Sequence, residues 1–198
     1  MANPSITGLI LAGGLGTRMG GQDKGLVALA GRPMVEHVLA RLAPQVGRVM
    51  INANRNADVY AHFGLPVLAD RLPGFVGPLA GLDAALHAPG TEGEWVLTCP
   101  CDSPFLPLDL APRMLAAALS TNADVAMASA GGQPEPAFLL AHLRVAPQLA
   151  AFLDGGGRQI RRWVGETRHV VVDFSDCPDA FSNINTPEEL ARQTPGPS

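Results

Sequence analysis

The sequence predicts an α/β protein, built as a three-layer, doubly wound and mostly parallel sheet with helices on both faces. Apolar segments of strand type alternate with segments whose apolar residues recur at helical spacing, which is the order of successive β-α-β units. A glycine-rich segment directly follows the first apolar run, and a carboxylate follows a later one. Because ligands of open α/β sheets bind beyond the carboxyl ends of the strands, these two segments also mark the expected site.

The expected strands are short and mostly continuous in their apolar character. Buried parallel strands have this appearance because helices cover both faces of the sheet. After Gly131-Gly132 the alternation changes, and Ala137–Ala141 is a candidate for a further, antiparallel strand. In chain order the expected strands are 6–11, 49–52, 66–69, 95–99, 124–129, 137–141 and 169–174.

The expected helices carry an apolar stripe at helical spacing. In Met34–Leu42 the apolar residues recur every three or four positions, and Pro33 suits the first helical position because proline lacks the N–H that is unpaired there. A last short helix is expected from Pro187, with Thr186 as its N-cap. The other expected helices are 59–63, 79–87, 110–119, 145–153 and 159–164.

Length and composition favour one globular domain, 1–193, followed by a flexible tail, 194–198. The chain has 198 residues, of which 47% are hydrophobic and 16% charged, so it can bury a full core. Its formal net charge is −4 and no basic stripe stands out, which argues against nucleic acid as a partner. No apolar run is long enough to span a membrane or resembles a signal peptide, so a cytoplasmic location is expected.

The glycine-rich segment Leu11–Lys24 predicts a phosphate site. Five of its fourteen residues are glycine, so backbone N–H groups can approach a ligand closely, and Arg18 and Lys24 add positive charge. The segment lacks the third glycine or alanine of a dinucleotide-binding loop, and Lys24 is followed by Gly25 rather than by the Ser or Thr of a P-loop. A plain surface turn is the alternative.

Asp102 is the candidate metal ligand. It follows the apolar strand Trp95–Cys99, so its carboxylate is expected at the same edge of the sheet as the glycine-rich segment. Mg²⁺ is typically held by one or two carboxylates together with substrate phosphates, which suits Asp102. The alternative is an aspartate that caps a turn before Pro104.

Weaker candidates lie at other strand ends and in the later part of the chain. Asn52 and Asp70 follow strands, where asparagine and aspartate are also common turn residues. Gly77 and Gly81 open a helix whose free N–H groups can bind a phosphate or a base. Three further polar residues can contact a substrate or a second metal, or can simply be solvated or capping residues: Arg158, Asn183 and Asn185.

The Leu11–Lys24 segment resembles the L-A-G-G-x-x-x-R-M-G…D-K signature of nucleotidyltransferases that activate sugars, terpenoid precursors and pterins. Further matches, in the same order over nearly the whole chain, resemble the molybdenum cofactor guanylyltransferases. They lie at 49–55, 77–81, 99–102, 172–176 and 181–190. One departure is Glu135-Pro136, where many relatives have a His-Pro pair.

This resemblance implies a Rossmann-like nucleotidyltransferase fold and the transfer of GMP from GTP to molybdenum-bearing molybdopterin, with release of pyrophosphate. It implies Mg²⁺ as the cofactor, bound by Asp102, and catalytic roles for Arg18, Lys24 and Asp102. Arg158, Asn183 and Asn185 would contact the pterin or a second metal. Residues and resemblance together give the expected GTP site as Leu11, Ala12, Gly13, Gly14, Gly16, Lys24, Asn52, Asp70, Gly77, Gly81 and Asp102.

The expected partners are the two substrates, GTP and molybdenum-molybdopterin, with no nucleic acid and no membrane. Transient contacts with molybdenum-insertion or chaperone proteins and with target apoenzymes are also expected. Two other functions stay open at the level of sequence. One is another nucleotidyltransferase, either a cytidylyltransferase acting on the same cofactor or an enzyme of sugar or isoprenoid phosphates. The other is a carrier that binds molybdopterin without catalysis.

Overall fold

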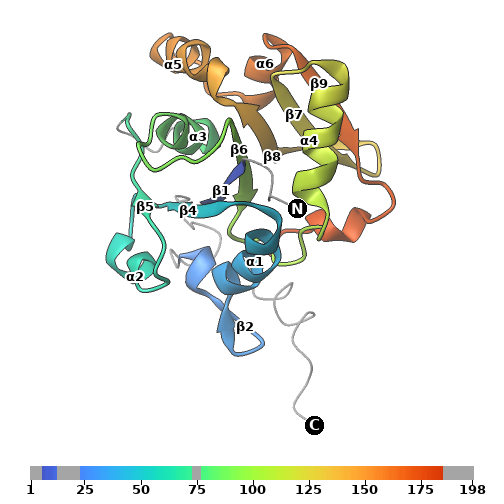
Figure 1. Ribbon diagram of the computed structural model, residues 1–198. Coiled ribbons are helices and arrows are strands. Elements are labelled where there is room, and N and C mark those ends of the chain that lie inside the picture. The colour runs from blue at the N-terminus through green and yellow to red at the C-terminus, as the bar shows by residue number, and fades with distance from the viewer. Residues whose placement is uncertain (1–5, 13–22, 73–76, 185–198) are drawn as a thin grey trace.

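The computed structural model describes residues 6–12, 23–72 and 77–184, and these form a seven-stranded sheet covered by helices (Figure 1). The strand order is β5-β4-β1-β6-β8-β7-β9. A separate two-stranded hairpin, β2-β3, lies beside the sheet. The strands are β1 Ile6–Leu11, β2 Ala28–Leu29, β3 Arg32–Pro33, β4 Arg48–Asn52, β5 Val67–Leu68, β6 Trp95–Pro100, β7 Val125–Ala130, β8 Gln133–His142 and β9 His169–Asp173.

The sheet is mostly parallel, as the sequence predicts. β1 pairs in parallel with β4 and β6, β4 with β5, and β7 with β9, whereas β8 runs antiparallel to both of its neighbours. The antiparallel strand expected at Ala137–Ala141 is therefore present and extends from Gln133 to His142. The chain builds outward from β1 to β4 and β5, and then continues on the other side of β1 with β6. This reversal places the carboxyl ends of β1 and β6 side by side, and open α/β sheets bind ligands at such a point.

Helices cover both faces of the sheet, so the predicted three-layer class is confirmed (Figure 1). Two of them pack on one face and share one hydrophobic core: α1 Met34–Leu42 and α4 Leu110–Thr121. Three pack on the other face around a second core: α3 Pro78–Leu86, α5 Ala146–Asp154 and α6 Ile160–Gly165. Adjacent side chains of β8 enter different cores, Phe138 the first and Leu139 the second, because successive residues of a strand point to opposite faces.

The structure differs from the sequence prediction around Pro33. This residue ends β3 and caps α1 with an extended ψ of 141°, so it lies one position before the helix. The hairpin itself was not predicted. Its two-residue connection has positive φ at Ala30 (50°) and Gly31 (80°). Such turns usually have the sequence Asn-Gly, and because alanine stands at the first position here, the sequence did not predict the turn.

Smaller shifts occur at the other elements. α2 spans Ala57–Ala61 rather than 59–63, and its N-cap, Asn56, adopts a left-handed conformation with φ of 52°. Single 3₁₀ turns that the sequence did not indicate lie at η2 Lys24–Leu26, η3 Ala43–Gln45, η4 Leu143–Val145 and η5 Pro178–Phe181. The helix expected from Pro187 and the tail at 194–198 lie outside the described residues. A single domain over 1–193 stays a prediction.

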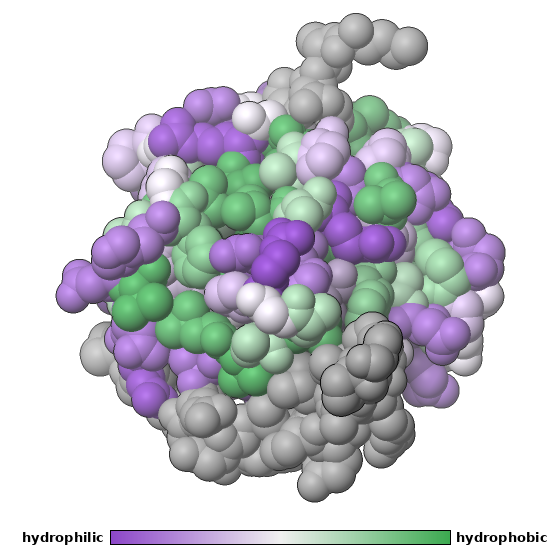
Figure 2. All heavy atoms as spheres, turned by 90° about the horizontal axis from the view of Figure 1, so that it is seen from below, coloured by the Kyte–Doolittle hydropathy of each residue, from purple (hydrophilic) through white to green (hydrophobic). Residues whose placement is uncertain are grey.

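One face of the molecule mixes polar and apolar side chains. Figure 2, which shows the molecule from below Figure 1, has hydrophilic and hydrophobic residues interspersed over the described part of this face. Among the described helices, none is long and apolar enough to cross a lipid bilayer.

Candidate functional site

The carboxyl ends of three neighbouring strands define the site. Leu11, the last residue of β1, is paired with Asn52 of β4 and Pro100 of β6. The backbone continues this contact beyond the strands, because Ala12 N–H donates to the Asn52 carbonyl (2.8 Å) and Cys101 N–H donates to the Leu11 carbonyl (3.1 Å). Residues that follow β1, β4 and β6 are therefore neighbours in space.

Lys24 and Asp102 meet at this edge. Lys24 opens the turn η2, Asp102 follows β6, and the Nζ of the lysine lies 2.9 Å from Oδ2 of the aspartate. Both side chains are largely shielded, with 22% and 11% of their surface exposed. The structure thus brings together the lysine of the expected phosphate site and the expected metal ligand, which are 78 positions apart in the sequence. At such a point the ammonium group can bind a polyanionic ligand, and the carboxylate can bind the cation that accompanies it.

A second polar cluster surrounds Asp70. Asn52 Nδ2 donates to Asp70 Oδ1 (2.9 Å) and Asn54 Nδ2 donates to Asp70 Oδ2 (2.7 Å). The backbone N–H of Asp70 donates to Asn54 Oδ1 (2.8 Å), so Asn54 holds this residue at two points. Each carboxylate oxygen retains further acceptor capacity, which lets Asp70 accept N–H or O–H donors from a ligand.

Helix α3 lies against this cluster because position 81 has no side chain. A Cβ at Gly81 would lie 2.4 Å from Asn52 Oδ1 and 2.8 Å from Leu11 Cδ2, so only glycine allows this close approach. Gly77 caps the same helix with φ of 90°, a conformation that favours glycine. These two glycines of the expected GTP site, Gly77 and Gly81, thus have a structural reason to be glycine, and their contact with a nucleotide stays a prediction.

The later part of the chain returns to Asp102. The backbone N–H of Ile184 donates to the Asp102 carbonyl (2.9 Å), and the Ser103 hydroxyl donates to Asn183 Oδ1. Asn183 therefore lies next to the candidate metal ligand. An amide that contacts the substrate would need such a position. Asn185 lies outside the described residues.

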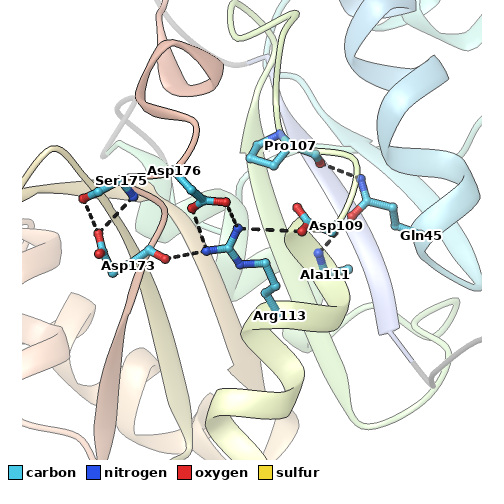
Figure 3. A network of polar contacts seen from close by, with 8 residues as sticks. All are labelled: Gln45, Pro107, Asp109, Ala111, Arg113, Asp173, Ser175 and Asp176. Carbon is cyan, nitrogen blue, oxygen red and sulfur yellow. Dashed lines mark hydrogen bonds and ion pairs between the residues drawn. The ribbon is translucent and has the colours of Figure 1, made fainter.

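Arg113 of α4 anchors the segment that leads back to the site (Figure 3). Its guanidinium binds both carboxylate oxygens of Asp176 (2.9 Å each), donates to the Asp173 carbonyl (2.6 Å) and lies 4.0 Å from the centre of the Phe174 ring. Hydrogen bonding from Arg113 lowers the pKa of Asp176 below its usual value. The bidentate pair fixes the orientation of this segment as well as its distance from α4.

Gln45 anchors the loop that follows Asp102 (Figure 3). Its Nε2 donates to the Pro107 carbonyl (2.9 Å), and its Oε1 accepts from the N–H of Ala111 (3.0 Å). Arg41 supports the same loop by donating from Nε to the Leu106 carbonyl (2.7 Å). Polar side chains of α1 and η3 thus provide hydrogen-bond partners for a loop backbone that would otherwise be buried without them.

Arg158 has its described contacts elsewhere. It donates from Nη1 to the carbonyls of Leu153 (2.7 Å) and Gly157 (2.6 Å), at the carboxyl end of α5. A cation suits this position because the last carbonyls of a helix lack intrahelical partners. These contacts do not join Arg158 to Asp102, and its role in substrate binding stays a prediction. Four other expected site residues lie outside the described part of the chain: Gly13, Gly14, Gly16 and Arg18.

The cysteines beside the site are buried thiols. Burial raises the pKa of both Cys99 and Cys101 far above the usual value, and the carboxylates of Asp102 and Asp23 raise that of Cys101 further. Neither thiol is therefore set up to ionise and bind a metal. Within 6–12, 23–72 and 77–184, no three His, Cys, Asp or Glu side chains form a group that could hold a metal ion. A cation at Asp102 would need oxygen ligands from a substrate, which is how Mg²⁺ commonly binds.

Sequence reasoning missed three residues that shape the site. Asn54 and Ser103 hold Asp70 and Asn183 respectively, and Tyr60 of α2 contacts the turn that carries Lys24. Asn54 could have been found from its spacing of two from Asn52, since alternate residues of an extended segment share a side. Nothing local in the sequence signals the other two, because their partners are distant in the chain.

Comparison with known proteins identifies the family. The sequence profile described as "MobA-like NTP transferase domain" matches residues 8–170. Among curated relatives, the molybdenum cofactor guanylyltransferase of Shewanella loihica is 48% identical over 187 residues, which cover 94% of each chain. The enzyme of the same name from Shewanella putrefaciens is 50% identical over 184 residues, which cover 93% of each chain.

Solved structures agree on the fold. Molybdopterin-guanine dinucleotide biosynthesis protein A of Archaeoglobus fulgidus has a TM-score of 0.79 at 22% identity, with 94% of this chain and 96% of that chain covered. The 4-diphosphocytidyl-2C-methyl-D-erythritol synthase of Anaerococcus prevotii has a TM-score of 0.73 at 11% identity, with 96% and 95% covered. The fold is thus shared by enzymes named for different nucleotides, whereas the sequence matches narrow the assignment: the chain belongs to the family of MobA-like NTP transferases.

Proposed function

We propose that this protein transfers GMP from GTP to molybdenum-bearing molybdopterin, giving the guanine dinucleotide form of the cofactor and pyrophosphate, in a reaction that requires Mg²⁺. The observation that carries the proposal is the 2.9 Å contact between Lys24 and Asp102 beside the end of β1. The curated relatives support the choice of substrates, since they are named molybdenum cofactor guanylyltransferases and are close to half identical in sequence.

Asp102 fits Mg²⁺, because a shielded carboxylate at the carboxyl end of parallel strands offers the hard oxygen ligand that this ion prefers. When bound, the ion would be held by Asp102 and would supply positive charge that offsets the charge of the phosphates. Lys24 would hold the β- and γ-phosphates, together with Arg18 and the N–H groups of the glycine-rich segment. The contact between Lys24 and Asp102 keeps these two roles at one place.

In this reaction the protein mainly positions the two substrates and stabilises negative charge. An oxygen of the acceptor's phosphate attacks the α-phosphorus of GTP, a new phosphorus–oxygen bond forms, and the bond to the β-phosphate oxygen breaks with its electrons leaving on pyrophosphate. A phosphate monoester is already anionic, so no side chain has to remove a proton from it. Lys24 stabilises the charge that builds up on the leaving pyrophosphate.

Asn52 and Asp70 would select the nucleotide. Asp70 can accept from the N1 and N2 hydrogens of guanine or from a ribose hydroxyl, and adenine and cytosine do not offer that pair of ring and amino donors. Asn183, beside Asp102, would contact the acceptor. Transient contacts with a protein that supplies the molybdenum-loaded acceptor, and with apoenzymes that receive the product, belong to the same proposal.

The test is a panel of the four nucleoside triphosphates, each mixed with molybdenum-loaded molybdopterin and Mg²⁺, with pyrophosphate and the nucleotide of the product measured. We expect product with GTP and loss of activity with EDTA. A product containing CMP would replace the proposal with a cytidylyltransferase. Tight binding of molybdopterin with no pyrophosphate from any nucleotide would instead indicate a carrier.

A further inference from the structure

Tyr60 is a buried tyrosine whose hydroxyl points to the site. It belongs to α2, is fully shielded from solvent and is the single tyrosine in the sequence. Its hydroxyl donates to Asp23 Oδ1 over 2.5 Å, a short hydrogen bond to a carboxylate. Hydrogen bonds to charged acceptors are shorter and stronger than those between neutral groups, so this contact ties α2 to the residue that precedes Lys24.

Asp23 in turn fixes the turn that carries Lys24. Its Oδ1 also accepts from the N–H of Gly25 (3.3 Å), which caps η2. Its Oδ2 accepts from Asn56 Nδ2 (3.1 Å) at the start of α2. Both carboxylate oxygens are therefore held from α2, and the backbone direction at Lys24 follows from that arrangement.

The hydroxyl of Tyr60 lies where two turns of the site touch. A Cβ added to Gly25 would lie 2.4 Å from Tyr60 Oη and 3.2 Å from Cys101 Cβ. The turn of Lys24 thus packs directly on the tyrosine and on the residue that precedes Asp102. A change at this point moves Lys24 relative to Asp102, because close-packed contacts transmit displacements.

Tyr60 keeps its proton under all ordinary conditions. Burial, with further contributions from Cys101 and Asp23, raises the pKa of its hydroxyl far above the usual value. The group therefore remains a hydrogen-bond donor to Asp23 and takes no part in proton transfer.

We propose that Tyr60 is a positioning residue for the triphosphate: through Asp23 it fixes the turn that places Lys24 beside Asp102. The inference rests on the proposed role of Lys24 in holding the β- and γ-phosphates. It follows that the hydroxyl of Tyr60 acts on affinity for the phosphate chain and leaves recognition of the nucleoside unchanged.

The experiment compares wild type, Tyr60→Phe, Lys24→Ala and the double variant by calorimetric titration with GTP and with GMP, in the presence of Mg²⁺. Tyr60→Phe is expected to lower the affinity for GTP about tenfold and to leave the affinity for GMP within about twofold of the wild-type value. In the Lys24→Ala background the same substitution is expected to change GTP affinity by less than twofold, since coupled residues are not additive.

Thr7→Val serves as the matched control. Thr7 is equally buried, and its hydroxyl donates to the Glu92 carbonyl (2.9 Å) and accepts from the Glu92 N–H (2.8 Å) near the start of β1, away from the site. Losing this hydroxyl is expected to lower the unfolding midpoint and to leave the ratio of GTP to GMP affinity at its wild-type value. A ratio that falls as in Tyr60→Phe would show a general effect of stability and overturn the inference.

The remaining outcomes are distinct. If Lys24→Ala leaves GTP affinity unchanged, the proposed function loses its phosphate-binding lysine. The inference on Tyr60 is wrong if Lys24→Ala lowers the affinity for GTP but Tyr60→Phe does not. It is also wrong if Tyr60→Phe lowers the affinities for GTP and GMP equally. Should Tyr60→Phe fail to fold, Asn56→Gly removes the exposed partner of Asp23 and still allows the left-handed backbone at this position. It is expected to weaken GTP binding about threefold, and unchanged GTP affinity would count against the proposal.

Discussion

At the scale of single residues, the proposed mechanism depends most on Asp102. We expect Asp102→Asn to reduce turnover at least about 100-fold, because the amide keeps the size of the side chain but loses the charge that attracts Mg²⁺. The fold should persist, since Lys24 is 22% exposed and can turn to solvent once its partner is neutral. Turnover against Mg²⁺ concentration, with circular dichroism as a check on folding, measures both effects, and a wild-type Mg²⁺ profile would contradict the assignment.

A second residue-scale prediction concerns Asn54. Asn54→Ala removes a 2.7 Å hydrogen bond to the Asp70 carboxylate and a 2.8 Å acceptor for its backbone N–H. The freed Asp70 side chain should select nucleotides less well, which we expect to lower kcat/KM for GTP about tenfold. Inosine triphosphate lacks the 2-amino group and 2′-deoxy-GTP lacks a ribose hydroxyl. The analogue whose disadvantage shrinks most in the variant identifies the group that Asp70 contacts.

Single residues also mark the limit of sequence reasoning. Lys24 and Asp102 were expected at one edge of the sheet from their places after strands, and they are in contact there. The catalytic roles given to them stay predictions. Tyr60 could not have been found in this way, because its partner lies 37 positions away and only the packing of α2 brings the two together.

At the scale of elements, helix α3 offers a test in which two effects compete. Gly81→Ala should raise the helix propensity by up to about 1 kcal/mol. The added methyl group, however, would lie 2.4 Å from Asn52 Oδ1 and must displace it, at a cost of about 1–3 kcal/mol. We expect net destabilisation in urea unfolding together with weaker GTP binding.

Gly165→Ala is the control for this experiment. Gly165 ends α6, and a Cβ there would meet no atom within 4 Å. This variant should be neutral or slightly more stable. Equal stability changes at both positions would show that the contact between α3 and Asn52 is looser than the structure indicates.

Elements were predictable to the extent that local pattern decides them. Helices with a clear apolar stripe, such as Met34–Leu42, have the expected bounds. The β2-β3 hairpin was not foreseen because its strands are two residues each and carry no alternation. Strand β8 is longer than expected because its register shifts opposite Met127 and Ala128, and the Thr98 hydroxyl satisfies the backbone there.

At the scale of the whole molecule, stability in acid should depend on Asp124. This carboxylate, one residue before β7, receives two hydrogen bonds from Arg168 (2.8 and 2.9 Å) just before β9, and Arg144 lies 3.2 Å away. Hydrogen bonding from Arg168 is the largest cause of its lowered pKa. Because the folded-state pKa is depressed, the contribution is present above the unfolded pKa of about 3.9 and is lost as pH falls below it.

The variant Asp124→Asn should therefore be less stable than wild type at pH 7 by about 1 kcal/mol, a value discounted because Arg168 is mostly exposed. The difference should shrink as the pH is lowered toward 3. Urea unfolding of both proteins between pH 3 and 7 measures it. A difference that stays constant over this range would show that packing, and not charge, is what the substitution disturbs.

The mostly parallel, three-layer class of the fold followed from the sequence, because alternating strands and helices predict successive β-α-β units. The order of the strands did not, since contacts such as the pairing of β7 with β9 are made across intervening elements. The edge of the sheet that carries the site was expected from the sequence, whereas the direct pairing of β1 with β6 at that edge came only from the strand order.

The return of the chain to Asp102 bears on how the protein is made. Ile184 binds the Asp102 carbonyl, and Asn183 is bonded to Ser103, 80 positions earlier. Domains usually fold in the order in which the ribosome delivers them. The turn of Asp102 therefore lacks these two contacts until residues 183 and 184 have been synthesised, so a nascent chain stalled before Pro178 would carry the sheet with an incomplete site.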